Sequence, residues 1–162
     1  MSESKSHSMV PKFIASLVLT LGAGAIAGYF SMNATTIYYQ LVLPSFAPPS
    51  WVFMPVWIIL YFLMGIAFFR VWAKGKDAPG VKSATSYFIT QLVFNVLWSV
   101  FFFSLNLRCA ALVDIIILLI YIIITTVKFF RIDKAAGLLM LPYLLWVGFA
   151  TALNLSIVLL NG

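Results

Sequence analysis

The chain has 162 residues, of which 64% are apolar and only 9% are charged, and its mean hydropathy is +1.09. This balance excludes an ordinary soluble domain. The net charge of +6 does not indicate a nucleic-acid partner, because the basic residues lie in short connections where anionic lipid headgroups account for them.

Five apolar stretches follow one another along the chain. Each has about 20 residues or more, which is enough for an α-helix to cross a hydrocarbon core of about 30 Å. We therefore expect an all-α membrane protein, a five-transmembrane-helix bundle. A polar cytoplasmic tail, residues 1–12, precedes a single domain, residues 13–162. The expected spans are Phe13–Met32, Trp51–Trp72, Ala84–Leu105, Cys109–Phe129 and Ala135–Leu160.

The basic residues are distributed unevenly between the two ends of these spans. Nine of the ten lie on one side, and Arg108 alone lies on the other. Short loops rich in Lys and Arg stay in the cytoplasm, so the amino terminus is predicted to be cytoplasmic and the protein to insert into an inner membrane. The nine are Lys5, Lys12, Arg70, Lys74, Lys76, Lys82, Lys128, Arg131 and Lys134.

The first span contains small residues that have two interpretations. Ala25 and Ala27 have the spacing of a signal-peptide cleavage site, whereas Gly24 and Gly28 have the spacing of close helix packing in lipid. We favour a retained span with Gly24 and Gly28 at a homodimer contact.

The longest connection, residues 33–50, is unusually apolar for a loop. We expect it either to fold back as a lid over the bundle or to lie at the membrane interface. Trp51 follows the proline-rich end of this loop. It is interpreted either as part of an interfacial aromatic belt or as a lid contribution to a binding site.

The third span carries two carboxamides, Gln91 and Asn95, on one stripe with Tyr87 and Trp98. Because amides are unfavourable against lipid, this stripe should face the bundle interior. Two roles are open: hydrogen bonds that join helices, worth about 0.6 kcal/mol each, or contact with a ligand.

Aromatic stripes recur on the second and fifth spans. The second has Trp57 and Tyr61, and on the fifth Pro142 should introduce a kink. Three such stripes predict one enclosed cavity for a large, flat, mostly apolar molecule. The fifth span contributes Tyr143, Trp146, Ala150 and Leu153.

Asp114, in the first turns of the fourth span, is the acid at membrane depth. It is expected to be structural, bonded to a neighbouring backbone group or to Asn106, with a proton relay as the alternative. No metal site is expected, because no cluster of His, Cys, Asp and Glu is evident.

Several motifs resemble the TspO/MBR family, which comprises the tryptophan-rich sensory proteins and the mitochondrial translocator protein. The resemblance covers about residues 13–161, in collinear order. It lies in Pro44–Trp57 with Leu60-Tyr61 and Met64-Gly65, in Gln91-Leu92-x-x-Asn95-x-x-Trp98, in Ala111–Asp114, and in Leu141-Pro142-Tyr143-Leu144-x-Trp146-x-x-Phe149-Ala150-x-x-Leu153-Asn154.

This resemblance implies a five-helix bundle, commonly a homodimer, with a pocket beneath the first loop for porphyrins such as protoporphyrin IX and for other apolar ligands. It implies no required cofactor; a porphyrin or haem-type tetrapyrrole would be the ligand. Some relatives lie in bacterial or mitochondrial outer membranes. The implied pocket residues are Phe46, Trp51, Trp57, Gln91, Asn95, Trp98, Trp146, Ala150 and Leu153.

The chain departs from the family pattern in its lid. Ile37 and Phe46 stand where family members commonly have tryptophan, and the carboxyl-terminal cholesterol pattern is absent. We therefore predict a membrane receptor, sensor or carrier for porphyrins and related apolar ligands. The alternative is an enzyme that degrades porphyrin with light and oxygen, an activity that the lost tryptophans make doubtful.

Overall fold

The computed structural model describes the backbone of residues 2–162 and the side chains from Met9 onward. Five helices are long and apolar enough to cross a membrane, as predicted. The long helices are α1 (Ser2–Phe30), α3 (Phe53–Ala73), α4 (Val81–Ser99), α5 (Arg108–Ile132) and α6 (Lys134–Asn161).

The ends of the spans differ slightly from those expected. Helix α1 is continuous from Ser2 to Phe30, so the predicted boundary at residue 12 falls inside one helix. The third span ends in a π-helical turn, η2 (Val100–Ser104), where the Leu105 N–H donates to the Val100 carbonyl at 2.9 Å. A positive φ of 53° at Asn106 then reverses the chain into α5.

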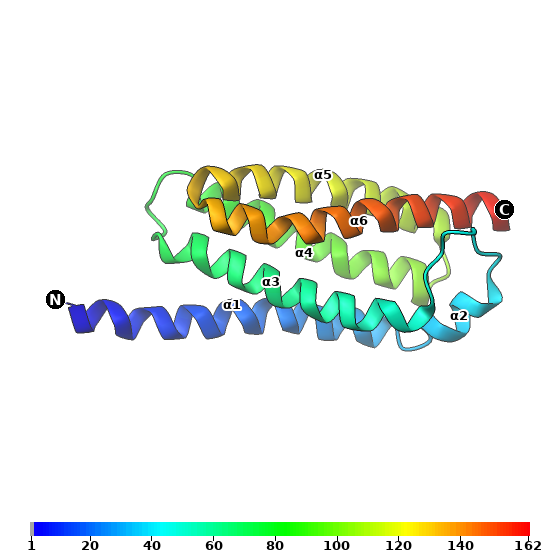
Figure 1. The fold of residues 1–162 in the computed structure, drawn as a ribbon, viewed down its shortest axis with the longest axis horizontal. Coiled ribbons are helices and arrows are strands. Elements are labelled where there is room, and N and C mark those ends of the chain that lie inside the picture. Colours follow the sequence, from blue (N-terminus) through cyan, green and yellow to red (C-terminus); the bar gives the residue numbers. More distant parts are fainter. Residues whose placement is uncertain (1) are drawn as a thin grey trace.

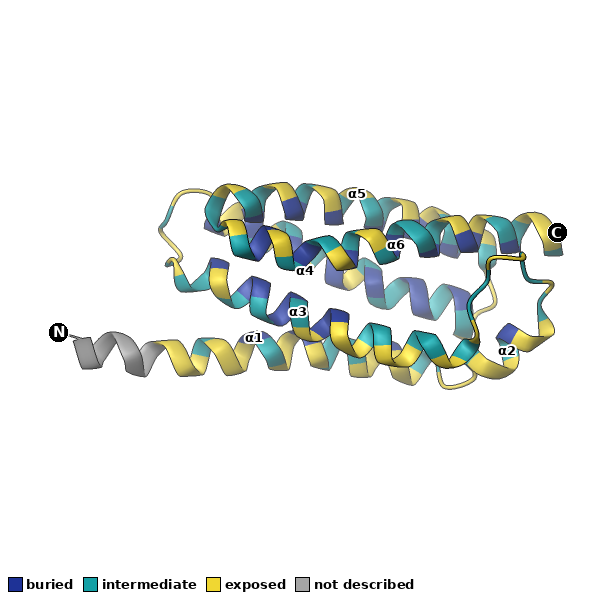
Figure 2. Cartoon of the chain, in the orientation of Figure 1, coloured by how far each residue is buried: buried dark blue, intermediate teal, exposed yellow. Residues whose placement is uncertain are grey.

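The five helices form a ring in which chain neighbours are not always spatial neighbours. The pairs α1–α3, α3–α6, α6–α5, α5–α4 and α4–α1 are in contact, so α3 packs against α6 although two helices separate them in sequence. The two ends of the chain lie at opposite ends of the bundle (Figure 1), as an odd number of spans requires. Buried residues face inward and exposed apolar residues face outward (Figure 2), the arrangement expected in lipid.

The connection between α1 and α3, here called the lid, closes one end of the bundle and contains a short helix, α2 (Ala34–Gln40), and a 3₁₀ turn, η1 (Ser50–Val52) (Figure 1). Tyr38 is its buried anchor, because its hydroxyl donates to the Pro48 carbonyl at 2.7 Å and its ring lies edge-on to Phe53. Tyr38 therefore attaches this connection to the start of α3.

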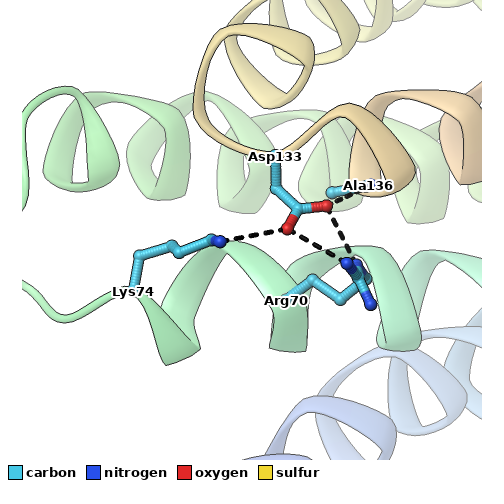
Figure 3. Close-up of polar contacts among 4 residues, drawn as sticks. All are labelled: Arg70, Lys74, Asp133 and Ala136. Carbon is cyan, nitrogen blue, oxygen red and sulfur yellow. Dashed lines mark hydrogen bonds and ion pairs between the residues drawn. The ribbon is translucent and has the colours of Figure 1, made fainter.

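Asp133 joins α3 to α6 at the opposite end of the bundle (Figure 3). Its carboxylate accepts two hydrogen bonds from Arg70, at 2.9 and 3.2 Å, and lies 3.3 Å from the Lys74 ammonium. It also caps α6 by accepting the Ala136 N–H at 2.9 Å. The hydrogen bonds from Arg70 hold the pKa of Asp133 well below its usual range.

Candidate ligand-binding site

A hydrogen-bonded network of four side chains from three helices occupies the bundle interior. The Tyr61 hydroxyl donates to Asn95 Oδ1, Asn95 Nδ2 donates to the Tyr143 hydroxyl at 3.0 Å, and that hydroxyl donates to Gln91 Oε1 at 2.6 Å. All four residues are buried. Gln91 Nε2 also lies 3.8 Å from the Met64 sulfur.

In this network the carboxamides of Gln91 and Asn95 join helices to one another. Gln91 and Asn95 bond to side chains of other helices, which is the first of the two roles predicted for them. Such bonds satisfy groups that would otherwise be costly inside a membrane protein. A direct contact between these amides and a ligand stays a prediction.

Trp98 belongs to a second polar link in the same interior. Its indole N–H donates to Asn154 Oδ1 at 3.1 Å, and Asn154 Nδ2 donates to the Arg108 carbonyl at 3.2 Å. This link joins α4, α6 and the first turn of α5. The nitrogen of Trp98 is therefore also satisfied within the chain.

Trp57 is placed where the three predicted stripes meet. Its ring centroid is 5.7 Å from that of Tyr61, 6.3 Å from that of Trp98 and 6.3 Å from that of Tyr143. The helical spacing thus correctly predicted that aromatic groups of α3, α4 and α6 converge. Ala150 and Leu153, also predicted on the α6 stripe, are buried in the core beside them.

A hollow of about 400 Å³ lies between α3 and α6. It is an open groove rather than the enclosed chamber that the stripes predicted, and exposed Ile59 and Leu145 are among its walls. Its lining is almost entirely apolar: Val56, Ile59, Leu60, Pro142, Leu145, Trp146 and Phe149.

Trp146 lines this groove and also carries an unpartnered polar atom. Its Nε1 is buried, and among the described residues it has no hydrogen-bond partner. Its ring lies 5.5 Å from Phe149 and 5.9 Å from Phe53. A buried N–H group without a partner carries a desolvation cost that an acceptor on a bound molecule would remove.

The lid reaches the groove through Phe46, whose ring lies 6.1 Å from that of Phe149. Phe46 is half exposed, at 49%. Trp51, in contrast, is 73% exposed and does not line the groove, so its position fits the interfacial belt that was its first interpretation.

Most of the groove-lining residues were not predicted, because aliphatic side chains on a membrane helix resemble lipid-facing positions. One signal was present: Pro142, Leu145, Trp146 and Phe149 follow at i, i+3, i+4 and i+7, which places them on one face of α6. The face opposite on α3 could be identified only once the two helices were known to be neighbours.

The two glycines of α1 have different surroundings. A Cβ at Gly24 would come 2.6 Å from the Tyr61 ring, so glycine is needed there for a contact within the chain. A Cβ at Gly28 would meet nothing within 4 Å. Of the two, Gly28 has the open surroundings that a contact with a second copy requires, and the dimer itself stays a prediction.

Asp114 differs from the expectation. It is buried, yet its Oδ2 has no hydrogen-bond partner among the described residues, and no bond joins it to Asn106. Asn106 instead occupies the turn before α5. The structure therefore gives no support for the predicted bond between these two residues.

Comparison with known proteins relates the chain to one family. Residues 15–160 match the profile of the TspO/MBR family. The chain is similar to the tryptophan-rich protein TspO of Archaeoglobus fulgidus, with 44% identity over 93% of this chain and 97% of that protein. It is similar to the protein of the same name from Chlorobaculum tepidum (42%, covering 88% and 91%) and to the translocator protein of Homo sapiens (31%, covering 90% and 89%).

Proposed function

The chain belongs to the TspO/MBR family, and from this premise we propose that it is a membrane receptor, sensor or carrier for tetrapyrroles such as protoporphyrin IX. The ligand lies in the groove between α3 and α6, beneath the lid. The partners we propose besides the ligand are membrane lipid and a second copy of the chain, packed against the α1 surface at Gly28.

One observation carries this proposal: Trp146 lines a groove with apolar walls, and its buried indole N–H has no partner among the described residues. Porphyrins have the matching chemistry, since they are flat, apolar rings with carboxylate oxygens at one edge. The ring would pack against Trp146 and Phe149, and a carboxylate would accept the Nε1 hydrogen.

The size and the exposure of the groove are consistent with such a ligand. Its volume of about 400 Å³ lies in the range of small-molecule sites. Ile59 and Leu145, 57% and 73% exposed, leave one side open toward the surrounding bilayer.

The test is a titration of the purified protein in lipid nanodiscs with protoporphyrin IX, followed by the absorbance of the porphyrin itself. Trp146→Phe removes the N–H group and keeps an aromatic ring. We expect this variant to bind about tenfold more weakly, the loss of one hydrogen bond to a charged acceptor. Trp51→Phe is the matched control, because Trp51 does not line the groove, and it should bind like the original protein.

Equal affinity in the original protein and Trp146→Phe would contradict the assignment of the groove. An absence of saturable binding to the original protein would contradict the proposed function itself. Light- and oxygen-dependent degradation of porphyrin, the alternative drawn from the sequence, has no observation in the structure that favours it.

A further inference from the structure

The last residue of α6, Asn161, holds the lid by a pair of hydrogen bonds to one backbone unit. The Val42 N–H donates to Asn161 Oδ1 at 2.9 Å, and Asn161 Nδ2 donates to the Val42 carbonyl at 3.0 Å. The same Nδ2 donates to the Ile157 carbonyl of its own helix at 2.8 Å. The α6 backbone therefore helps to fix the amide plane that meets the lid.

The local backbone explains why the lid needs such a partner. Helix α2 ends at Gln40, and Leu41 is extended, with φ −92° and ψ 148°. An extended segment without a neighbouring strand leaves its N–H and C=O groups unpaired. The side-chain amide of Asn161 presents a donor and an acceptor side by side, as a neighbouring strand would.

The neighbouring Leu41 and Leu43 pack against the core, whereas the Val42 side chain itself does not. The Val42 side chain is 58% exposed, so the two hydrogen bonds are its evident attachment to α6. Four residues later, Phe46 lies against Phe149 of the groove wall. The attachment of Val42 to Asn161 therefore helps to hold the lid segment that carries Phe46 against α6.

The opposite end of the groove helices is fixed differently. There Asp133 binds Arg70 of α3 and Lys74, the residue that follows α3, while it caps α6 (Figure 3). This cluster keeps the two helices together at that end. A widening of the groove for a bulky, flat ligand would therefore take place at the lid end.

From these contacts we propose that Asn161 is a positioning residue that latches the lid to α6 and sets how fast a tetrapyrrole enters and leaves the groove. The inference rests on the proposed function and concerns rates rather than affinity. The latch bonds involve no ligand atom, so they form in the empty and in the occupied protein. Breaking them raises the opening rate equally in both states.

The expected size of the effect follows from the two bonds. Partly exposed hydrogen bonds have modest net strength, so the loss of both should raise entry and exit rates about tenfold. The dissociation constant should stay within about twofold, because both rates change by the same factor. A role limited to the shape of the site would give a different result: a faster exit and a weaker affinity.

The experiment uses the full chain in nanodiscs and stopped-flow mixing with protoporphyrin IX. Asn161→Ala removes both bonds and should give the tenfold change. Asn161→Asp keeps an acceptor for the Val42 N–H but has no donor for the Val42 carbonyl. Its entry and exit rates should therefore fall between those of the original protein and those of Asn161→Ala. The matched control is Ser156→Ala on the same helix, since the Ser156 hydroxyl bonds only to the Ala152 carbonyl of α6, and its rates should be unchanged.

Hydrogen exchange of the lid without porphyrin provides an independent measurement. The Val42 amide should exchange about tenfold faster in Asn161→Ala than in the original protein or in Ser156→Ala. Unchanged exchange would overturn the latch. Faster exchange with unchanged porphyrin rates would overturn its control of ligand entry. If the original protein bound no porphyrin, the proposed function and control of porphyrin entry would both fail, and exchange would still decide whether Asn161 holds the lid.

Discussion

The hydrogen bond between Tyr61 and Asn95 offers a direct test of the interior network. Asn95→Ala removes the acceptor of the Tyr61 hydroxyl and the amide that donates to Tyr143. Tyr143 keeps its bond to Gln91, whereas the buried Tyr61 hydroxyl loses its partner in the network. These unequal consequences allow the energy to be worked out bond by bond.

Two lost interhelical bonds cost about 1.2 kcal/mol at the average value of about 0.6 kcal/mol each in membrane proteins. The stranded hydroxyl adds about 1–3 kcal/mol. Asn95→Ala should therefore lower the free energy of unfolding by about 2–4 kcal/mol. Tyr61→Phe removes the hydroxyl itself, so it should cost less.

The assay is reversible unfolding in mixed micelles by added SDS, followed by far-UV circular dichroism, for both single variants and the double variant. The double-mutant cycle should give a coupling energy of about 1.6–3.6 kcal/mol, the shared bond plus the stranded hydroxyl that the double variant lacks. Thr90→Ala is the control on the same helix, because the Thr90 hydroxyl bonds only to the Ser86 carbonyl of α4. Additivity within about 0.5 kcal/mol would refute the bond as an energetic link between α3 and α4.

Three further predictions concern other parts of the fold. Gly24→Ala should destabilise the protein by about 1–3 kcal/mol, because its Cβ would collide with the Tyr61 ring. Gly28→Ala should be neutral or stabilising, because its Cβ meets no atom within 4 Å. Equal effects of the two changes in the same unfolding assay would contradict the packing of α1. Asp133→Asn keeps a cap for α6 but loses the ion pairs, so at pH 7 it should cost about 0.5–2 kcal/mol. The pKa of Asp133 is lower in the folded chain than its unfolded value of about 3.9. The stability that the ion pairs contribute is therefore present above a pH of about 3.9 and is lost as the pH falls from there through the folded pKa, so the unfolding free energies of the original protein and Asp133→Asn should converge in acid. A difference that persists in acid would contradict the electrostatic cause. The exposed Cys109, at the start of α5, should react with a membrane-impermeant maleimide from outside intact cells if the amino terminus is cytoplasmic, and labelling only after permeabilisation would reverse the orientation.

Much of the fold could be predicted because a bilayer restricts what a chain can do. An apolar stretch of about 20 residues has to be helical to satisfy its backbone, so the five spans followed from hydropathy alone. The inward placement of Gln91 and Asn95 followed from the cost of amides in lipid. These are consequences of the solvent, and they need no knowledge of which helix contacts which.

The arrangement of the site could not be predicted in the same way. The partners of Asn95 lie on α3 and α6, and the groove depends on α3 packing against α6 rather than against α4 alone. Helical periodicity gives the face of one helix but not the order of helices around a bundle. For this reason the convergence of aromatic rings was predicted correctly, whereas the open groove and its aliphatic walls were not.

The hydrogen bonds of Gln91 and Asn95 within the chain have a consequence for how the protein assembles in the membrane. Both core carboxamides are engaged by hydroxyls of the same polypeptide, so the bundle can mature in the membrane before it meets any guest molecule. Under the proposed function, synthesis and ligand supply then vary independently, and the ratio of loaded to vacant molecules follows how much ligand the membrane contains. A protein whose core needed the ligand to fold could not act as such a sensor, because its ligand-free form would be degraded.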